Sequence, residues 1–152
     1  QGFSTLLENR KSTRSAEQAV KEAEAMMGQL EDVRAVPDIF AKVAEGMQFH
    51  EVSLDIFEEE GRLGTKGEPD SSTLTKRLYW KDPEQSGYFS RDKEFVVEFG
   101  INGRNYAYGT VKYRFMDGRS SLKVQEEVLL ERIHDAFASM ATRIRKSKST
   151  ER

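Results

Sequence analysis

The stretch FVVEFGINGRNYAYGTVKYRF, residues 95–115, decides the fold. Its first half places an apolar side chain at every second position, the period of a half-buried strand: Phe95, Val97, Phe99 and Ile101. The pair Asn102-Gly103 follows, and it favours a two-residue type I′ turn because both of its positions need positive φ. The stretch therefore predicts an antiparallel β-hairpin with strands over residues 95–101 and 104–115.

The return strand, residues 104–115, is expected to present two different faces. One face would carry the polar and aromatic set Tyr106, Tyr108, Thr110, Lys112 and Arg114. The other would carry Ala107, Gly109, Val111, Tyr113 and Phe115. The small Ala107 and Gly109 would allow a helix to pack close to this second face.

Two further strands are predicted upstream of the hairpin. In residues 50–59, apolar Val52, Leu54 and Ile56 alternate with polar side chains. Residues 74–80 (LTKRLYW) have the composition of a second strand. Glycine, proline and polar residues dominate 60–73 and 81–91, which predicts loops there.

Three helices are predicted, two before these strands in the chain and one after them. Residues 14–34 carry small and apolar side chains at heptad spacing, residues 37–46 begin at Pro37 and end at a capping Gly46, and residues 121–146 form a long amphipathic helix. Ser120 or Ser121 is the expected N-terminal cap of the last helix.

The element order predicts an α+β fold with an antiparallel sheet of about four to five strands, flanked by N- and C-terminal helices. We expect three parts: a connector helix (1–35), the sheet domain (36–146) and a basic tail (147–152).

Composition narrows the classes of function. The 152 residues suit one domain, 33% of them are charged, and there is no cysteine for disulfides, thiol catalysis or zinc ribbons. A net charge of −2 disfavours general nucleic-acid binding. The two histidines, His50 and His134, are expected to be structural, so we expect neither a metal, a cofactor nor catalytic residues.

Aromatic residues of the central segment, together with one arginine, are the candidate ligand site, with ordinary sheet packing as the alternative. The set is Arg77, Tyr79, Trp80, Tyr88, Phe89, Tyr106 and Tyr108. Apolar stripes on the terminal helices predict a homodimer. These are Ala16, Ala19, Ala23, Met26, Leu30 and Val33, together with Phe137, Met140 and Ile144.

Basic residues Arg10, Lys11 and Arg14 follow a short apolar cluster at the start of the chain. This order is that of the cytoplasmic flank of a membrane helix, or of a solvated helix start, and both interpretations remain open.

The segments VPDIFAKVAEGMQFHEVSLDIFE, FVVEFGI, NG, RNYAYGTVKYRF, MDGRS and LKVQEEVLLERIHDAFASMATRIRK together resemble a GAF domain in element types and spacing. The resemblance covers residues 36–146 and implies a sheet flanked by helices, often dimeric, in a sensory or regulatory module. The chain departs from the family in two respects. Residues 60–91 show no clear helix, and neither the cysteine of bilin-binding members nor the Asn-Lys…Phe…Asp-Glu pattern of cyclic-nucleotide-binding members is present.

The basic start followed by a GAF-like domain also resembles the cytoplasmic tail of some bacterial polyprenyl-phosphate N-acetylhexosamine-1-phosphate transferases. The leading hypothesis is therefore a non-catalytic, cytoplasmic regulatory domain that dimerises through its terminal helices and binds a small molecule. The alternative is an interaction scaffold without a ligand, attached to such a membrane enzyme.

Overall fold

The computed structural model describes the backbone of residues 2–67, 74–81 and 94–150, and the side chains of residues 14–67 and 94–147. The strands are β1 (Glu51–Glu59), β2 (Arg62–Leu63), β3 (Leu74–Lys81), β4 (Phe95–Asn102) and β5 (Ala107–Phe115). All pairings are antiparallel, in the order β3-β1-β5-β4, and β2 pairs with the end of β1. The predicted α+β class and antiparallel sheet are confirmed.

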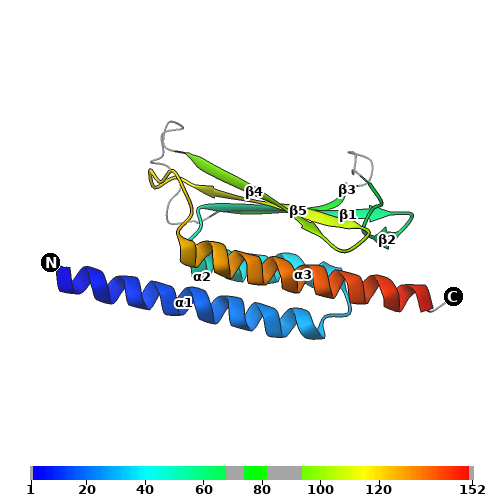
Figure 1. Cartoon of the computed structure of the whole chain (residues 1–152), viewed down its shortest axis with the longest axis horizontal. Helices are drawn as coiled ribbons and strands as arrows, with labels where there is room; N and C mark the ends of the chain where they lie inside the picture. Colours follow the sequence, from blue (N-terminus) through cyan, green and yellow to red (C-terminus); the bar gives the residue numbers. More distant parts are fainter. Residues whose placement is uncertain (1, 68–73, 82–93, 151–152) are drawn as a thin grey trace.

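Three helices lie on one side of this sheet (Figure 1). They are α1 (Gly2–Gln29), α2 (Val36–Met47) and α3 (Val124–Thr150), with a short 3₁₀ turn, η1 (Val33–Ala35), between α1 and α2. α2 and α3 pack on the face of the sheet, and α1 packs on these two helices from the side away from the sheet (Figure 1). α1 and α3 lie side by side and run in the same direction, whereas α2 runs back against them (Figure 1). The helix predicted over 14–34 ends at Gln29, because Asp32 accepts the N–H of Arg34 at 2.9 Å and starts the 3₁₀ turn instead.

The core lies between the sheet and the helices. The register pairs Val52 with Tyr113 and Leu54 with Val111, so these buried side chains form one face of the sheet. α1 supplies Ala16, Val20, Ala23 and Met27 to the same core. Part of the predicted connector, residues 1–35, is thus built into the hydrophobic core.

The buried stripe of α1 differs in phase from the predicted seam. Met27 and Val20 are fully buried, while Met26 is 41% exposed and Ala19 is half-buried. Both phases satisfy heptad spacing. The observed one buries Val20 in place of Ala19 and Met27 in place of Met26, so it removes more apolar area from water at the first of these positions.

The type I′ turn is formed at Glu60-Gly61 and not at Asn102-Gly103. Glu60 (φ 56°) and Gly61 (φ 79°) both have positive φ, and they join β1 to β2 inside the segment predicted as a plain loop. Asn102 pairs with Ala107, and the Gly103 N–H donates to the Tyr106 carbonyl at 2.8 Å. The hairpin loop therefore holds four residues, 103–106, and the predicted two-residue turn is wrong.

Two glycines mark places where backbones approach closely. Gly46 lies inside α2, and a Cβ on it would lie 2.4 Å from the Ala19 Cβ of α1; the C-terminal cap is Gln48 instead. A Cβ on Gly109 of β5 would lie 2.4 Å from the Asp55 carbonyl oxygen of β1. The predicted cap at Gly46 is wrong because the residue serves helix packing.

Within the described part of the chain, no helix combines the length and the apolar character that crossing a membrane requires.

Candidate functional site

Contacts between α3 and the sheet form the main polar cluster beneath the sheet. The Tyr113 hydroxyl of β5 shares a 2.8 Å hydrogen bond with His134 Nε2 of α3, and the Phe99 ring of β4 lies 4.9 Å from the His134 ring. Burial lowers the pKa of His134 to about 4 and raises the pKa of Tyr113. At neutral pH both groups are uncharged, so this bond holds α3 in place and does not provide a poised acid or base.

A β-bulge turns Tyr108 toward α3. The register runs from Ile101↔Gly109 to Asn102↔Ala107, which leaves Tyr108 as the extra residue of β5. The Tyr108 hydroxyl lies 3.0 Å from Thr142 Oγ1, and the ring fills the space beside Gly64 and Gly103.

The prediction that Tyr106 and Tyr108 share a face with Thr110, Lys112 and Arg114 is wrong. Lys112 is exposed and lies 3.8 Å from Glu98 on the outer face, while both tyrosines contact α3. The bulge breaks the period of two on which the prediction depended.

Arg145 ties the far half of α3 to two loops. Its Nη1 donates to the carbonyl oxygens of Leu63 (2.6 Å) and Gly64 (3.1 Å), and its guanidinium lies 3.7 Å above the Tyr106 ring. Thr65 pairs with Ala107 next to this contact through two 2.9 Å backbone hydrogen bonds. The β2 segment and the β4–β5 loop are therefore both held by α3.

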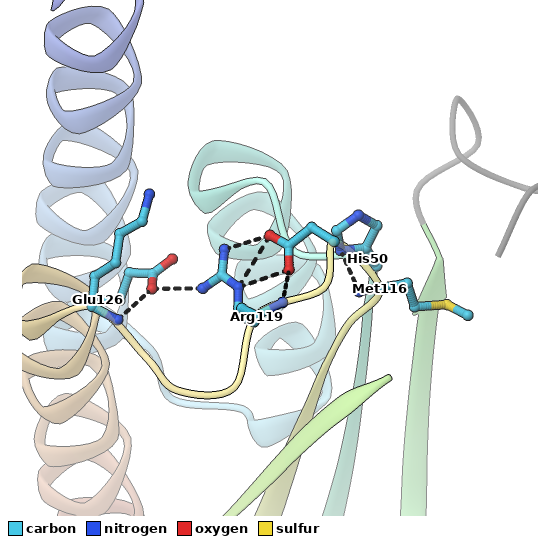
Figure 2. A network of polar contacts seen from close by, with 6 residues as sticks. His50, Met116, Arg119 and Glu126 are labelled. Atoms are coloured by element: carbon cyan, nitrogen blue, oxygen red, sulfur yellow. Dashed lines mark hydrogen bonds and ion pairs between the residues drawn. The ribbon is translucent and has the colours of Figure 1, made fainter. Parts of the chain in front are cut away.

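A second polar network holds the start of α3 against the sheet (Figure 2). Arg119 pairs with Asp117 at 2.8 Å and with Glu126 at 2.7 Å, and it lies 3.9 Å above the Phe115 ring. Arg119 thereby lowers the pKa of Asp117. His50, just before β1, accepts the Met116 N–H on Nδ1 at 3.2 Å, which joins the network to the start of β1.

Glu126 also caps α3, because its Oε1 accepts the Lys123 N–H at 2.8 Å. The predicted caps Ser120 and Ser121 precede the helix by three residues or more, so that prediction is wrong.

The outer face of the sheet carries ion pairs. Arg114 of β5 bridges Glu51 (2.9 Å) and Glu94 (3.1 Å). The Glu51 side chain is only 9% exposed, so this pair is better shielded from solvent than the pair between Lys112 and Glu98. On the described strands, acidic side chains of β4 and β1 thus lie on either side of the basic side chains of β5.

The predicted ligand set is only partly placed. Tyr106 and Tyr108 lie together, with ring centroids 6.4 Å apart, and are contacted by Arg145 and Thr142. In β3 the backbone register sets Arg77 opposite Asp55, Tyr79 opposite Ser53 and Trp80 opposite Val52. The side chains of these three residues, and all of Tyr88 and Phe89, lie outside the described residues.

Most residues predicted to form a dimer seam have intramolecular partners. Ala16, Ala23, Phe137, Met140 and Ile144 are buried in the core, and Leu30 and Val33 pack against it. Among the nine residues of this set, Met26 has the greatest exposure, at 41%. Dimerisation itself stays a prediction, since one chain is described.

Sequence reasoning missed both Thr142 and Arg145. A signal was available: buried tyrosine hydroxyls need partners, and β5 carries two tyrosines opposite polar residues of the amphipathic α3. In the described residues, no three His, Asp or Glu side chains gather as metal ligands.

Comparison with models of known protein families and with curated proteins finds no match for this chain.

Proposed function

We propose that the chain is a non-catalytic regulatory domain of the GAF-like kind, in which α3 couples the sheet to α1. The observation that carries the proposal is the position of α3, which makes specific polar contacts on both of its sides. A change in the sheet would reach α1 through a single rigid element.

The sheet side of α3 supports the first half of this coupling. His134, Thr142 and Arg145 each contact the sheet or its loops, so the attachment extends over about three turns of α3. Contacts at several points along the helix make it move as a body.

The α1 side of α3 supports the second half. Arg132 forms an ion pair with Glu24, and Arg143 donates from Nη2 to the Met27 carbonyl oxygen at 2.9 Å. Because α1 and α3 run parallel (Figure 1), a shift of α3 along its axis changes both contacts, relaxing one while it strains the other.

A regulatory domain needs two arrangements that a ligand or partner binds unequally. The register aligns Trp80 with Val52 and Val52 with Tyr113, at the far end of β5 from the β4–β5 loop, so the predicted ligand set does not form one site. In this proposal the small molecule binds beside Tyr106 of the β4–β5 loop, and the homodimer forms through the terminal helices. Attachment to a membrane-bound sugar-phosphate transferase remains a prediction from the sequence.

A scaffold without a ligand is the second candidate, and one observation favours it. Tyr108 is 2% exposed, and its hydroxyl is already paired with Thr142. A ring packed in this way offers little surface to a ligand unless α3 moves.

Hydrogen exchange of the full chain tests the coupling. Thr142→Val removes the bond to Tyr108 with little change of shape, at a cost of about 1 kcal/mol. If α3 couples the two sides, amides of residues 16–29 in α1 should exchange faster, although α1 has no part in the altered bond. Thr110→Val, on the outer face, is the matched control and should leave α1 unchanged. Faster exchange confined to α3 and β5 would contradict the proposal.

A thermal-shift screen with nucleotides, amino sugars and lipid-linked sugar phosphates separates the two candidates. A ligand at 100 times its Kd stabilises by about 2.7 kcal/mol. A shift supports the sensor, and the absence of any shift supports the scaffold. Light scattering over a concentration series tests the dimer, and a strict monomer at high micromolar concentration would refute it.

A further inference from the structure

The edge of the sheet formed by β4 is apolar and, within the described residues, is paired on one side only. β4 pairs with β5, and its sequence FVVEFGIN holds a single charged residue, Glu98. Edge strands usually carry lysine, proline or bulges that prevent another strand from adding. Val96 is 38% exposed on this strand, so β4 retains the features of a strand that accepts a partner.

The apolar surface continues onto the first half of α3. Val124 is 75% exposed and Val128 is 51% exposed, and they lie one helical turn apart. The contact between Phe99 and His134 fixes this half of α3 beside β4, and Phe95, Val97 and Phe99 are only partly buried. Together these residues of β4 and α3 form a surface that we call the β4–α3 flank.

Acidic side chains border the β4–α3 flank. Residues 124–135 of α3 hold four acidic residues (Glu126, Glu127, Glu131 and Asp135) against one arginine, Arg132, which is paired with Glu24. Residues 94–102 hold Glu94 and Glu98 and no basic residue; these two pair with Arg114 and Lys112 on β5. Glu127, Glu131 and Asp135 are exposed, so the flank carries excess negative charge.

We propose that the β4–α3 flank binds an extended segment of a partner protein in which lysine or arginine alternates with apolar residues. The segment adds to β4 as a further strand, so that main-chain hydrogen bonds hold it and alternate side chains select it. Its apolar side chains face Val128 and the partly buried rings of β4, and its basic side chains face Glu98 on the outer side. The acidic stripe of α3 attracts the segment. This inference goes beyond the coupling role and does not depend on it.

A labelled octapeptide of alternating valine and lysine tests the proposal, with every second amide N-methylated so that only one of its edges can pair. The full chain should bind this peptide in an anisotropy titration, and an octapeptide of alternating valine and glutamate should not bind. On binding, alternate backbone amides of β4 should become protected from hydrogen exchange, because a paired strand engages every second residue.

Two variants locate the site without touching the core. Glu131→Lys should weaken binding by about fivefold, because it replaces an attraction by a repulsion at an exposed position. Val128→Asn should weaken it by about tenfold through the loss of apolar contact, with no change of charge. Glu45→Lys, an exposed acidic residue of α2, makes the same charge change elsewhere and should leave the affinity unchanged.

Three results would overturn the proposal. The first is equal affinity for both peptides, or a loss of affinity with Glu45→Lys as large as that with Glu131→Lys. The second is binding without alternate protection in β4. The third is protection, in the free chain, of the β4 amides that point away from β5; if it grows with protein concentration, a second copy of the chain occupies the edge, and if it does not, the edge is covered within one chain.

Discussion

Replacing Gly46 by alanine should destabilise the protein, although the same change in most helices stabilises it. Gly46 lies inside α2 where α2 crosses α1, and an added Cβ would stand 2.4 Å from the Ala19 Cβ and 3.3 Å from the Ser15 carbonyl oxygen. Carbon atoms in contact normally lie about 3.5–4.0 Å apart. The helices must therefore separate, or one must shift along the other.

Two opposing effects set the magnitude. Alanine in place of glycine in a helix interior favours folding by about 1 kcal/mol. Forcing an extra methyl group into a packed contact typically costs about 1–3 kcal/mol, and the stiff backbone of α1 on the far side of the contact places this case toward the upper end. We expect Gly46→Ala to lower the free energy of unfolding by about 1–2 kcal/mol, a fall in Tm of about 2–8 °C for this chain length.

Gly28→Ala is the matched control. Gly28 lies in the last turn of α1, and no atom lies within 4 Å of an added Cβ. This variant should leave the free energy of unfolding unchanged or raise it by up to about 1 kcal/mol. In urea denaturation, Gly46→Ala should therefore lower the free energy of unfolding, whereas Gly28→Ala should raise it or leave it unchanged.

A compensating change sharpens the measurement. Ala19→Gly alone should cost about 1 kcal/mol of helix propensity, yet in the Gly46→Ala background it removes the atom that clashes. The double mutant should therefore be at least about 1 kcal/mol more stable than the sum of the two single changes predicts. If Gly46→Ala stabilises the chain as much as Gly28→Ala, or if the two sites are additive, the close crossing of α1 and α2 is refuted.

Gly109→Ala should cost about 1–3 kcal/mol in thermal unfolding because its Cβ would meet a backbone oxygen 2.4 Å away, whereas Gly100→Ala meets only a side chain at 3.4 Å and should cost less than about 1 kcal/mol. The pKa of His134, about 4 when folded against about 6.5 unfolded, makes the unfolded chain bind more protons between these values, so stability is complete above pH 6.5 and falls as the pH drops toward 4. From pH 7 to pH 5 the wild type should lose about 2 kcal/mol more than His134→Gln, which cannot titrate; equal losses in urea titrations would contradict the buried neutral histidine. Glu126→Ala should cost about 1–2 kcal/mol by removing both the cap of α3 and the Arg119 ion pair, while Glu127→Ala should change the chemical denaturation midpoint little; equal effects would mean that the cap has no energetic weight.

The regular parts of the fold followed from the sequence because their signals are local. Alternation over 50–59 and 95–101 gave β1 and β4 to within one residue, and helical spacing gave α2 as 37–46 against the observed Val36–Met47. Each of these segments buries one face, so the pattern of apolar residues carries the period of the structure.

The turns and the polar contacts depend on long-range packing and could not be obtained in this way. The bulge at Tyr108 reverses which face the tyrosines occupy, and no local pattern marks it. The four-residue loop after Asn102 accompanies that bulge, so a favourable Asn-Gly pair did not determine the turn. The contacts of Thr142 and Arg145 join residues 34 and about 80 positions apart, which only the folded chain brings together.

The parallel course of α1 and α3 has a consequence for engineering the chain. Gly2 begins α1 near one end of the long axis and Thr150 closes α3 near the other (Figure 1). Each helix is about 40 Å long at 1.5 Å per residue. α1 and α3 are also offset along this axis (Figure 1), so a circular permutant would need a linker longer than either helix, which means more than about 12 extended residues. End-to-end fusion of further domains needs no such linker, and it would make a straight tandem array in which each sheet domain follows the last.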